Sequence, residues 1–161
     1  MKQFEKYCRR LFKPVLEDKF RFKIVDVKHT DFSDYLIYQN ATTGIKISYE
    51  PREGGIFVLL SRLIDGKMPE YPIYIKADTI LNSFDLEDII SFKLAKKGIG
   101  HKFKNYFRKY NFNRKASLVR NLTRYAEELE EHAAYILNGD FGDFPELEKI
   151  VKARGKLILK S

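Results

Sequence analysis

Apolar residues recur with a helical period at the start of the chain. Between residues 3 and 17 they stand three or four positions apart, which places them on one face of an α-helix. Pro14 lies inside this segment. Because proline removes an amide donor and crowds the preceding turn, a kink or split is predicted there. The apolar face consists of Phe4, Tyr7, Cys8, Leu11, Val15 and Leu16.

The hydrophobic period then changes from helical to alternating. Four segments rich in β-branched and aromatic residues are predicted strands, at 21–28, 34–39, 45–50 and 56–63. In the third, Ile45, Ile47 and Tyr49 fall on one face and polar residues on the other. Because the connections are short and turn-like, we expect an antiparallel meander with one solvated face. The fourth strand is the most apolar and is predicted to be central, and a short edge strand is predicted at 73–76.

The remaining chain returns to helical spacing. Ser83 is the predicted N-cap of a helix at 84–95, and Asn138-Gly139 is the predicted C-cap of a long helix at 115–137. Further helices are predicted around 103–110 and from Asp143, with Glu146 completing a capping box, to Gly155. The whole chain, 1–161, is therefore predicted to form a single α+β domain. Its sheet has four to five strands, preceded by an N-terminal helix and followed by three to four helices.

Composition limits the class of protein. The 161 residues are 44% hydrophobic and 32% charged, which is typical of a globular domain and too apolar for a disordered one. The lone cysteine, Cys8, cannot form an internal disulfide, which fits a reducing compartment. The N-terminal segment is charged throughout, and no apolar run is long enough for a membrane span. We therefore expect a cytoplasmic protein that does not insert into membranes.

Charge is distributed unevenly along the chain. Eleven basic residues and no acidic ones lie between Lys93 and Arg124, whereas the other 19 basic residues are outnumbered by 22 acidic ones. We call residues 93–124 the basic sector. Its cations at the start of the long helix oppose the helix dipole, so folding alone does not explain them. An acidic protein surface or a nucleic acid would explain them, and a solvated face that keeps the protein soluble is the alternative without a partner.

Cations alternate with aromatic residues in the stretch HKFKNYFRKYNFNRK, residues 101–115. Phe103, Tyr106, Phe107 and Tyr110 have the spacing of one helix face. A platform for stacking bases needs its rings exposed beside the charges, whereas a core helix needs rings and charges on opposite faces. The spacing favours rings in the core.

No known catalytic or metal-binding motif is present. The histidines, His29, His101 and His132, lie on different predicted elements and lack the spacing of metal ligands. Asp140-Phe141-Gly142 matches a kinase motif, but its companion motifs are missing. The sequence therefore predicts neither a cofactor nor an enzymatic activity.

Three short motifs resemble those of small, largely uncharacterised bacterial α+β proteins, some of which are candidate immunity proteins for polymorphic toxins. They are Thr43-Gly44-Ile45, Tyr49-Glu50-Pro51-Arg52-Glu53 and Leu137-Asn138-Gly139-Asp140-Phe141. The resemblance implies an N-terminal helix, a meander sheet and C-terminal helices. It carries over no catalytic residues.

The function expected from the sequence is a non-catalytic protein-interaction domain, of immunity type if the resemblance holds, that binds an acidic surface of a partner protein. The alternative is a nucleic-acid-binding module that uses the same basic sector. The candidate binding residues for either partner are Lys96, Lys97, Lys102, Lys104, Arg108, Lys109, Arg114 and Lys115.

Overall fold

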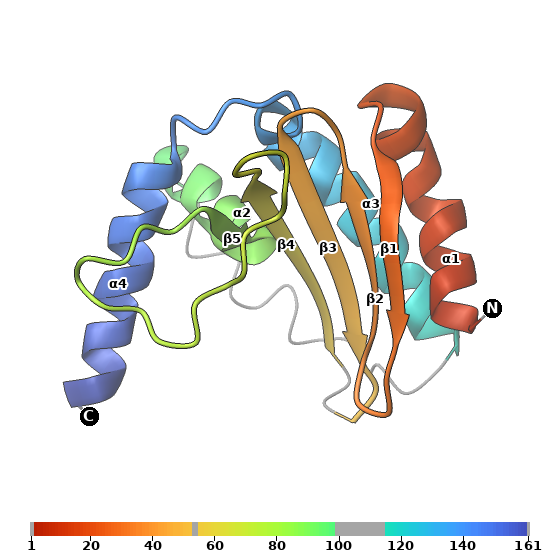
Figure 1. Ribbon diagram of the computed structural model, residues 1–161, viewed down its shortest axis with the longest axis horizontal. Helices are drawn as coiled ribbons and strands as arrows, with labels where there is room; N and C mark the ends of the chain where they lie inside the picture. The colour runs from red at the N-terminus through yellow and green to blue at the C-terminus, as the bar shows by residue number, and fades with distance from the viewer. Residues whose placement is uncertain (1, 53–54, 99–114, 161) are drawn as a thin grey trace.

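The computed structural model describes residues 2–52, 55–98 and 115–160 and has the α+β architecture expected from the sequence (Figure 1). An N-terminal helix precedes a five-stranded antiparallel sheet, and three further helices follow. The elements in chain order are α1 (Gln3–Phe12), η1 (Lys13–Lys19), β1 (Lys23–His29), β2 (Asp34–Gln39), β3 (Thr43–Glu50), β4 (Gly55–Arg62), β5 (Ser83–Asp85), α2 (Leu86–Lys96), α3 (Lys115–Leu137) and α4 (Phe144–Lys160).

The sheet is a meander in which each strand pairs with the next, in the order β1-β2-β3-β4-β5. Ile47 of β3 lies opposite Leu36 of β2 and Val58 of β4, and all three are buried. The neighbouring position in β3, Lys46, points to the other face and is only half-buried. The alternation of the sequence therefore gives a sheet with one apolar face, as predicted.

Helices α1, α2 and α3 lie behind this apolar face, and the opposite face is turned toward the viewer (Figure 1). Phe4 of α1 stacks on Tyr49 of β3, with ring centroids 5.5 Å apart. Buried side chains from α3 complete the layer: Leu118, Leu122, Tyr125, Ala126, Leu129, Ala133, Ile136 and Leu137. None of the helices among the described residues is long and apolar enough to cross a membrane.

Pro14 changes the form of the first helix, as its position in the sequence predicts. The regular α-helix ends at Phe12, and a π-helical segment with Pro14 in its first turn takes over. Proline leaves a carbonyl of the preceding turn without its usual amide partner, and the wider π turn shifts the later bonds by one residue. The amide of Phe20 accordingly donates to the carbonyl of Val15, at 3.1 Å.

Two predictions between β4 and α2 were wrong. Residues 73–76 form no strand; the fifth strand is Ser83–Asp85, and the chain between β4 and β5 runs as a loop. Ser83 is therefore in a strand and not at a helix N-cap, and its hydroxyl lies 2.6 Å from that of Ser61 in β4. β4 has a strand on both sides only over residues 59–61, so it is only partly the central strand that its composition predicts.

The C-terminal part of the chain is partly as expected. Asn138-Gly139 ends α3: Gly139 has a φ of 88°, and the amides of Gly139 and Asp140 bond back to Ile136 and Tyr135. The predicted stop at Gly155 was wrong, because α4 continues through it to Lys160. The predicted aromatic helix at 103–110 lies outside the described residues.

Candidate functional site

The predicted basic binding residues fall into two groups in the structure. Lys102, Lys104, Arg108, Lys109 and Arg114 lie outside the described residues, and Lys115 is described only as the first backbone position of α3. Lys96 is at the end of α2, and Lys97 follows it on the surface. The structure therefore locates the side chains of only two of the eight residues.

The described part of the basic sector is partly compensated by carboxylates, whereas the sequence led us to expect uncompensated charge. Lys93 and Lys96 lie 2.9 and 3.3 Å from the carboxylate of Asp143, just before α4. Arg124 lies 3.8 Å from Glu128 on the next turn of α3. Burial alone would raise the pKa of Asp143, but hydrogen bonds from Lys93, Tyr135 and Lys96 lower it. Asp143 lies directly before α4, where its carbonyl accepts the amide of Leu147 at 3.0 Å, and its carboxylate also ties the start of α4 to α2.

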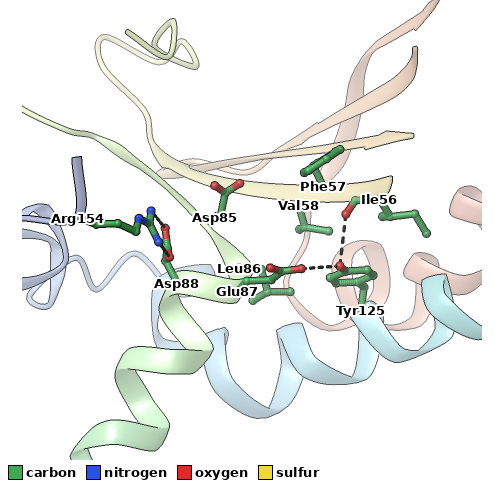
Figure 2. A pocket seen from close by; sticks show the side chains of 9 residues that line it. All are labelled: Ile56, Phe57, Val58, Asp85, Leu86, Glu87, Asp88, Tyr125 and Arg154. Atoms are coloured by element: carbon green, nitrogen blue, oxygen red, sulfur yellow. Dashed lines mark hydrogen bonds and ion pairs between the residues drawn. The ribbon is translucent and has the colours of Figure 1, made fainter. Parts of the chain in front are cut away.

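A different site is present at the β5 edge of the sheet, which sequence reasoning missed. A pocket with a volume of about 160 Å³ opens where β5 ends and, among the described residues, the first half of β4 pairs only with β3. We call it the acidic pocket. It is lined by Ile56, Phe57, Val58, Asp85, Leu86, Glu87, Asp88, Tyr125 and Arg154 (Figure 2).

Two of its three carboxylates already have partners. Arg154 of α4 donates two hydrogen bonds to Asp88, at 2.7 and 3.0 Å. The hydroxyl of Tyr125 lies 3.0 Å from Glu87 Oε1 and 3.3 Å from the carbonyl of Ile56, so it can donate to either. Figure 2 shows these contacts as dashed lines. Among the described residues, none makes a hydrogen bond or ion pair with the third carboxylate, Asp85 (Figure 2).

The electrostatics of the pocket follow from this arrangement. Burial and the charges of Asp88 and Glu87 raise the pKa of Asp85 to about 6, although Arg154 acts in the opposite direction. Burial and the charge on Glu87 also raise the pKa of the Tyr125 hydroxyl. A cation placed beside Asp85 would relieve the repulsion among the carboxylates. The pocket is therefore suited to bind a cation or to exchange a proton near neutral pH.

The loop between β4 and β5 brings an exposed apolar surface close to this pocket. We call residues 71–80 the apolar loop. Ile73, Tyr74 and Ile80 are 89, 79 and 73% exposed. The loop is tied to the domain at Ala77, whose carbonyl accepts a hydrogen bond from Lys152 of α4 at 2.9 Å. In Figure 1 the yellow-green loop crosses in front of α4.

Two further groups of titratable side chains are present in the described residues. Glu128, Glu131 and His132 on α3 place potential ligand atoms within 4.8 Å of one another. Their i, i+3, i+4 spacing is visible in the sequence, although sequence reasoning named no metal site. Glu128 contacts both Arg124, at 3.8 Å, and His132, at 3.1 Å, and the Glu131 side chain is 71% exposed, so a network of side-chain contacts along α3 explains the cluster.

The other group lies at the opposite edge of the sheet, where β1 has no outer neighbour. His29 lies between two carboxylates, with its Nδ1 2.9 Å from Asp34 and its Nε2 3.0 Å from Glu5. Arg9 also donates to Glu5, and Lys2 donates to Asp34, at 2.8 and 3.0 Å. We call these five residues the β1-edge cluster. All its carboxylates have partners, so it is a closed structural network.

Cysteine chemistry is not available on the surface of this domain. Cys8 is completely buried in the core, and burial together with the charge on Glu5 raises the pKa of its thiol well above the ordinary value. A thiol in this setting is neither nucleophilic nor accessible.

No family model, curated protein or solved structure matches this chain. The resemblance to bacterial immunity proteins accordingly stays a prediction. The acidic pocket and the apolar loop must be interpreted from their own geometry.

Proposed function

We propose that this domain is a non-catalytic protein-interaction module that binds a partner protein through the apolar loop. The exposure of Ile73, Tyr74 and Ile80 on one short segment is the observation that carries the proposal. Single exposed apolar residues are common, but a cluster of them on one loop is typical of an interaction site. Burying each of these side chains in an interface would contribute about 1.5–3 kcal/mol.

The build of the loop supports the same function. The amide of Lys76 bonds to the hydroxyl of Thr79, and the amide of Thr79 bonds back to the carbonyl of Lys76. Together with the contact between Lys152 and Ala77, these bonds hold the backbone in one form. A loop that is ordered before binding loses less conformational entropy when a partner covers it. An immunity-type role, in which the partner is a toxin, is one form of this proposal.

The basic sector remains a second route to a partner. Because most of its side chains lie outside the described residues, the acidic protein surface expected from the sequence stays a prediction. Among its described cations, Lys93 and Lys96 pair with Asp143, which weakens the field that this part of the sector can present. The support for a protein partner therefore comes mainly from the apolar loop.

Site-specific photo-crosslinking tests this function. A photoreactive phenylalanine analogue replaces Tyr74 in the apolar loop or, as a control, Phe32 in the β1–β2 turn, which is 63% exposed. Expressed in its native host, the first variant should give one crosslinked protein that the second does not. That protein, once purified, should bind the I73S/Y74S double variant on the order of 10²-fold more weakly than the wild type.

Three outcomes would contradict the proposal. The first is equal crosslinking from both positions, and the second is unchanged affinity of I73S/Y74S. The third is a crosslink only to a second copy of this chain, which would make the loop a self-association interface. A salt titration with generic RNA and DNA tests the alternative function. Binding that falls steeply with salt, and flattens when Lys102, Lys104, Arg108 and Lys109 are changed to alanine, would favour a nucleic-acid module.

A further inference from the structure

We propose that the acidic pocket receives a basic side chain, arginine or lysine, presented by the protein that binds the apolar loop. This inference rests on the proposed function, because it identifies the chemistry of the same partner. It differs from the expectation drawn from the basic sector, which was an acidic partner surface. The lining of the acidic pocket holds three carboxylates, Asp85, Glu87 and Asp88, and one cation, Arg154.

The carboxylate of Asp85 is the first feature of the pocket that points to a basic ligand. Glu87 and Asp88 are engaged with Tyr125 and Arg154, whereas Asp85 has no bonded partner among the described residues. A half-buried carboxylate without a partner is unfavourable, and a charged hydrogen-bond donor in the pocket would satisfy it. The two side-chain hydrogen bonds of Arg154 among the described residues both go to Asp88 and not to Asp85 (Figure 2).

The second argument is the size and shape of the pocket. Its volume of about 160 Å³ is smaller than the roughly 300–1,000 Å³ typical of pockets for small-molecule ligands, so it suits a single side chain. The carboxylates of the pocket are not among the described groups whose oxygens converge closely enough to hold one metal ion. An extended cation with several donors therefore fits better than a metal.

The third argument is that the pocket and the apolar loop form neighbouring parts of one surface. Lys152 of α4 donates to the carbonyl of Ala77 in the loop at 2.9 Å, and Arg154, two residues further along the same helix, lines the pocket. Burial and the charges of Asp85 and Asp88 also raise the pKa of Tyr71, at the start of the loop. Phe57, which is 43% exposed, lines the pocket on the strand side. A cation that reaches Asp85 can pack against an aromatic ring, and apolar neighbours in the partner can cover the loop.

A titration with a minimal probe tests the inference without the partner. The probe is Nα-acetyl-arginine methylamide, and its neutral isostere, the citrulline derivative, is the control ligand. Two-dimensional NMR of the full chain follows the amide signals of 85–88. Near neutral pH, we expect saturable shifts with the arginine probe and none with citrulline. A lysine derivative shows which basic side chain is preferred.

Variants and pH complete the test. D85N should weaken probe binding about tenfold or more, whereas D31N, which removes an exposed carboxylate from the β1–β2 turn at the opposite edge of the sheet, should leave it unchanged. Binding by the wild type should weaken as the pH falls through about 6, where Asp85 becomes protonated. Equal shifts with citrulline, no saturable shift with the arginine and lysine probes, or unchanged binding by D85N would each overturn the inference.

The inference and the proposed function can fail separately. If crosslinking at Tyr74 identifies a partner but the probes do not bind, only the basic side chain is wrong. If the arginine probe binds but no partner contacts the loop, the pocket binds cations independently of the proposed function.

Discussion

Carboxylates lie at both edges of the sheet, but they differ in their hydrogen-bond partners and in the direction in which their pKa is shifted. At the β1 edge, the side chains of Glu5 and Asp34 are only 10 and 11% exposed, and both bond to His29. At the β5 edge, Asp85 is half-buried beside two other carboxylates and bonds to none of the described residues. Burial alone would raise the pKa of Glu5, but hydrogen bonds from Arg9 and His29 lower it, whereas the pKa of Asp85 rises to about 6.

This difference distinguishes the β1-edge cluster, which is a structural network, from the acidic pocket, where a carboxylate is available to a ligand. Burial acts in the same direction on both carboxylates, so the presence or absence of a donor decides their state. The β1-edge cluster uses its charges to hold α1 against the β1–β2 hairpin. Its carboxylates already have hydrogen-bond partners, so a ligand would gain little by bonding to them. In the acidic pocket, Asp85 has no bonded partner among the described residues, and an exposed apolar surface lies beside it. We therefore propose that a partner binds at the β5 edge.

The largest expected change in stability comes from removing His29 from the β1-edge cluster. Replacing His29 with alanine removes the imidazole that contacts both Glu5 and Asp34, because one ring nitrogen faces each carboxylate. Leaving these two largely buried carboxylates with one partner fewer should reduce the free energy of unfolding by about 2–3 kcal/mol. Urea unfolding followed by circular dichroism measures the change.

A control for this variant lies next to it in the sequence. Lys28 is exposed, and K28A should change the free energy of unfolding by less than about 0.5 kcal/mol. If H29A were as stable as K28A, the network would be open in solution and the difference between the two edges would disappear.

Replacing Asp85 with asparagine should raise the free energy of unfolding instead of lowering it, and the gain should depend on pH. An aspartate whose pKa is raised on folding lowers stability above that pKa, and this effect vanishes below its ordinary pKa. D85N should therefore stabilise the domain by about 1–2 kcal/mol near neutral pH and have no effect near about pH 3. Urea unfolding across the acid range measures the difference, with D78N as the control.

Glu5 provides the mirror image of this pH dependence. A glutamate whose pKa is lowered on folding contributes stability above its ordinary pKa and loses it as the pH falls through the lowered value. E5Q should accordingly destabilise the domain near neutral pH, and its difference from the wild type should fade in acid. If E5Q and D85N changed stability in the same direction, the assignment of one edge to structure and the other to binding would fail.

These two edges also show how far the sequence could be interpreted. The alternation in 45–50 was enough to predict β3 and its buried face, because a period of two has one structural meaning over several residues. Ser83–Asp85 is too short for an alternating period to indicate a strand or its buried face. The aromatic and β-branched residues at 73–76, in contrast, indicated a strand where the chain forms an exposed loop.

The candidate site was beyond the reach of local patterns. Its lining residues come from β4, the β5–α2 junction, α3 and α4, and only the folded chain brings them together. The cluster Asp85-Leu86-Glu87-Asp88 is visible in the sequence, but acidic residues at a helix start are also explained by the helix dipole. The contacts of Lys93 and Lys96 with Asp143 were hidden for the same reason, since roughly fifty residues separate the partners.

The smallest expected effect on stability tests whether Arg154 sets the charge of the acidic pocket. The Arg154 side chain is 55% exposed, so losing its two bonds to Asp88 should cost no more than about 1 kcal/mol. Its charge, however, lowers the pKa of Asp85 against the effects of burial, Asp88 and Glu87. In R154Q the pKa of Asp85 should therefore rise further above 6, as measured by NMR of its carboxyl carbon. R154K keeps the charge and should leave that pKa nearly unchanged. If R154Q also left it unchanged, solvent would be screening the pocket, and a partner's basic side chain would gain little from entering it.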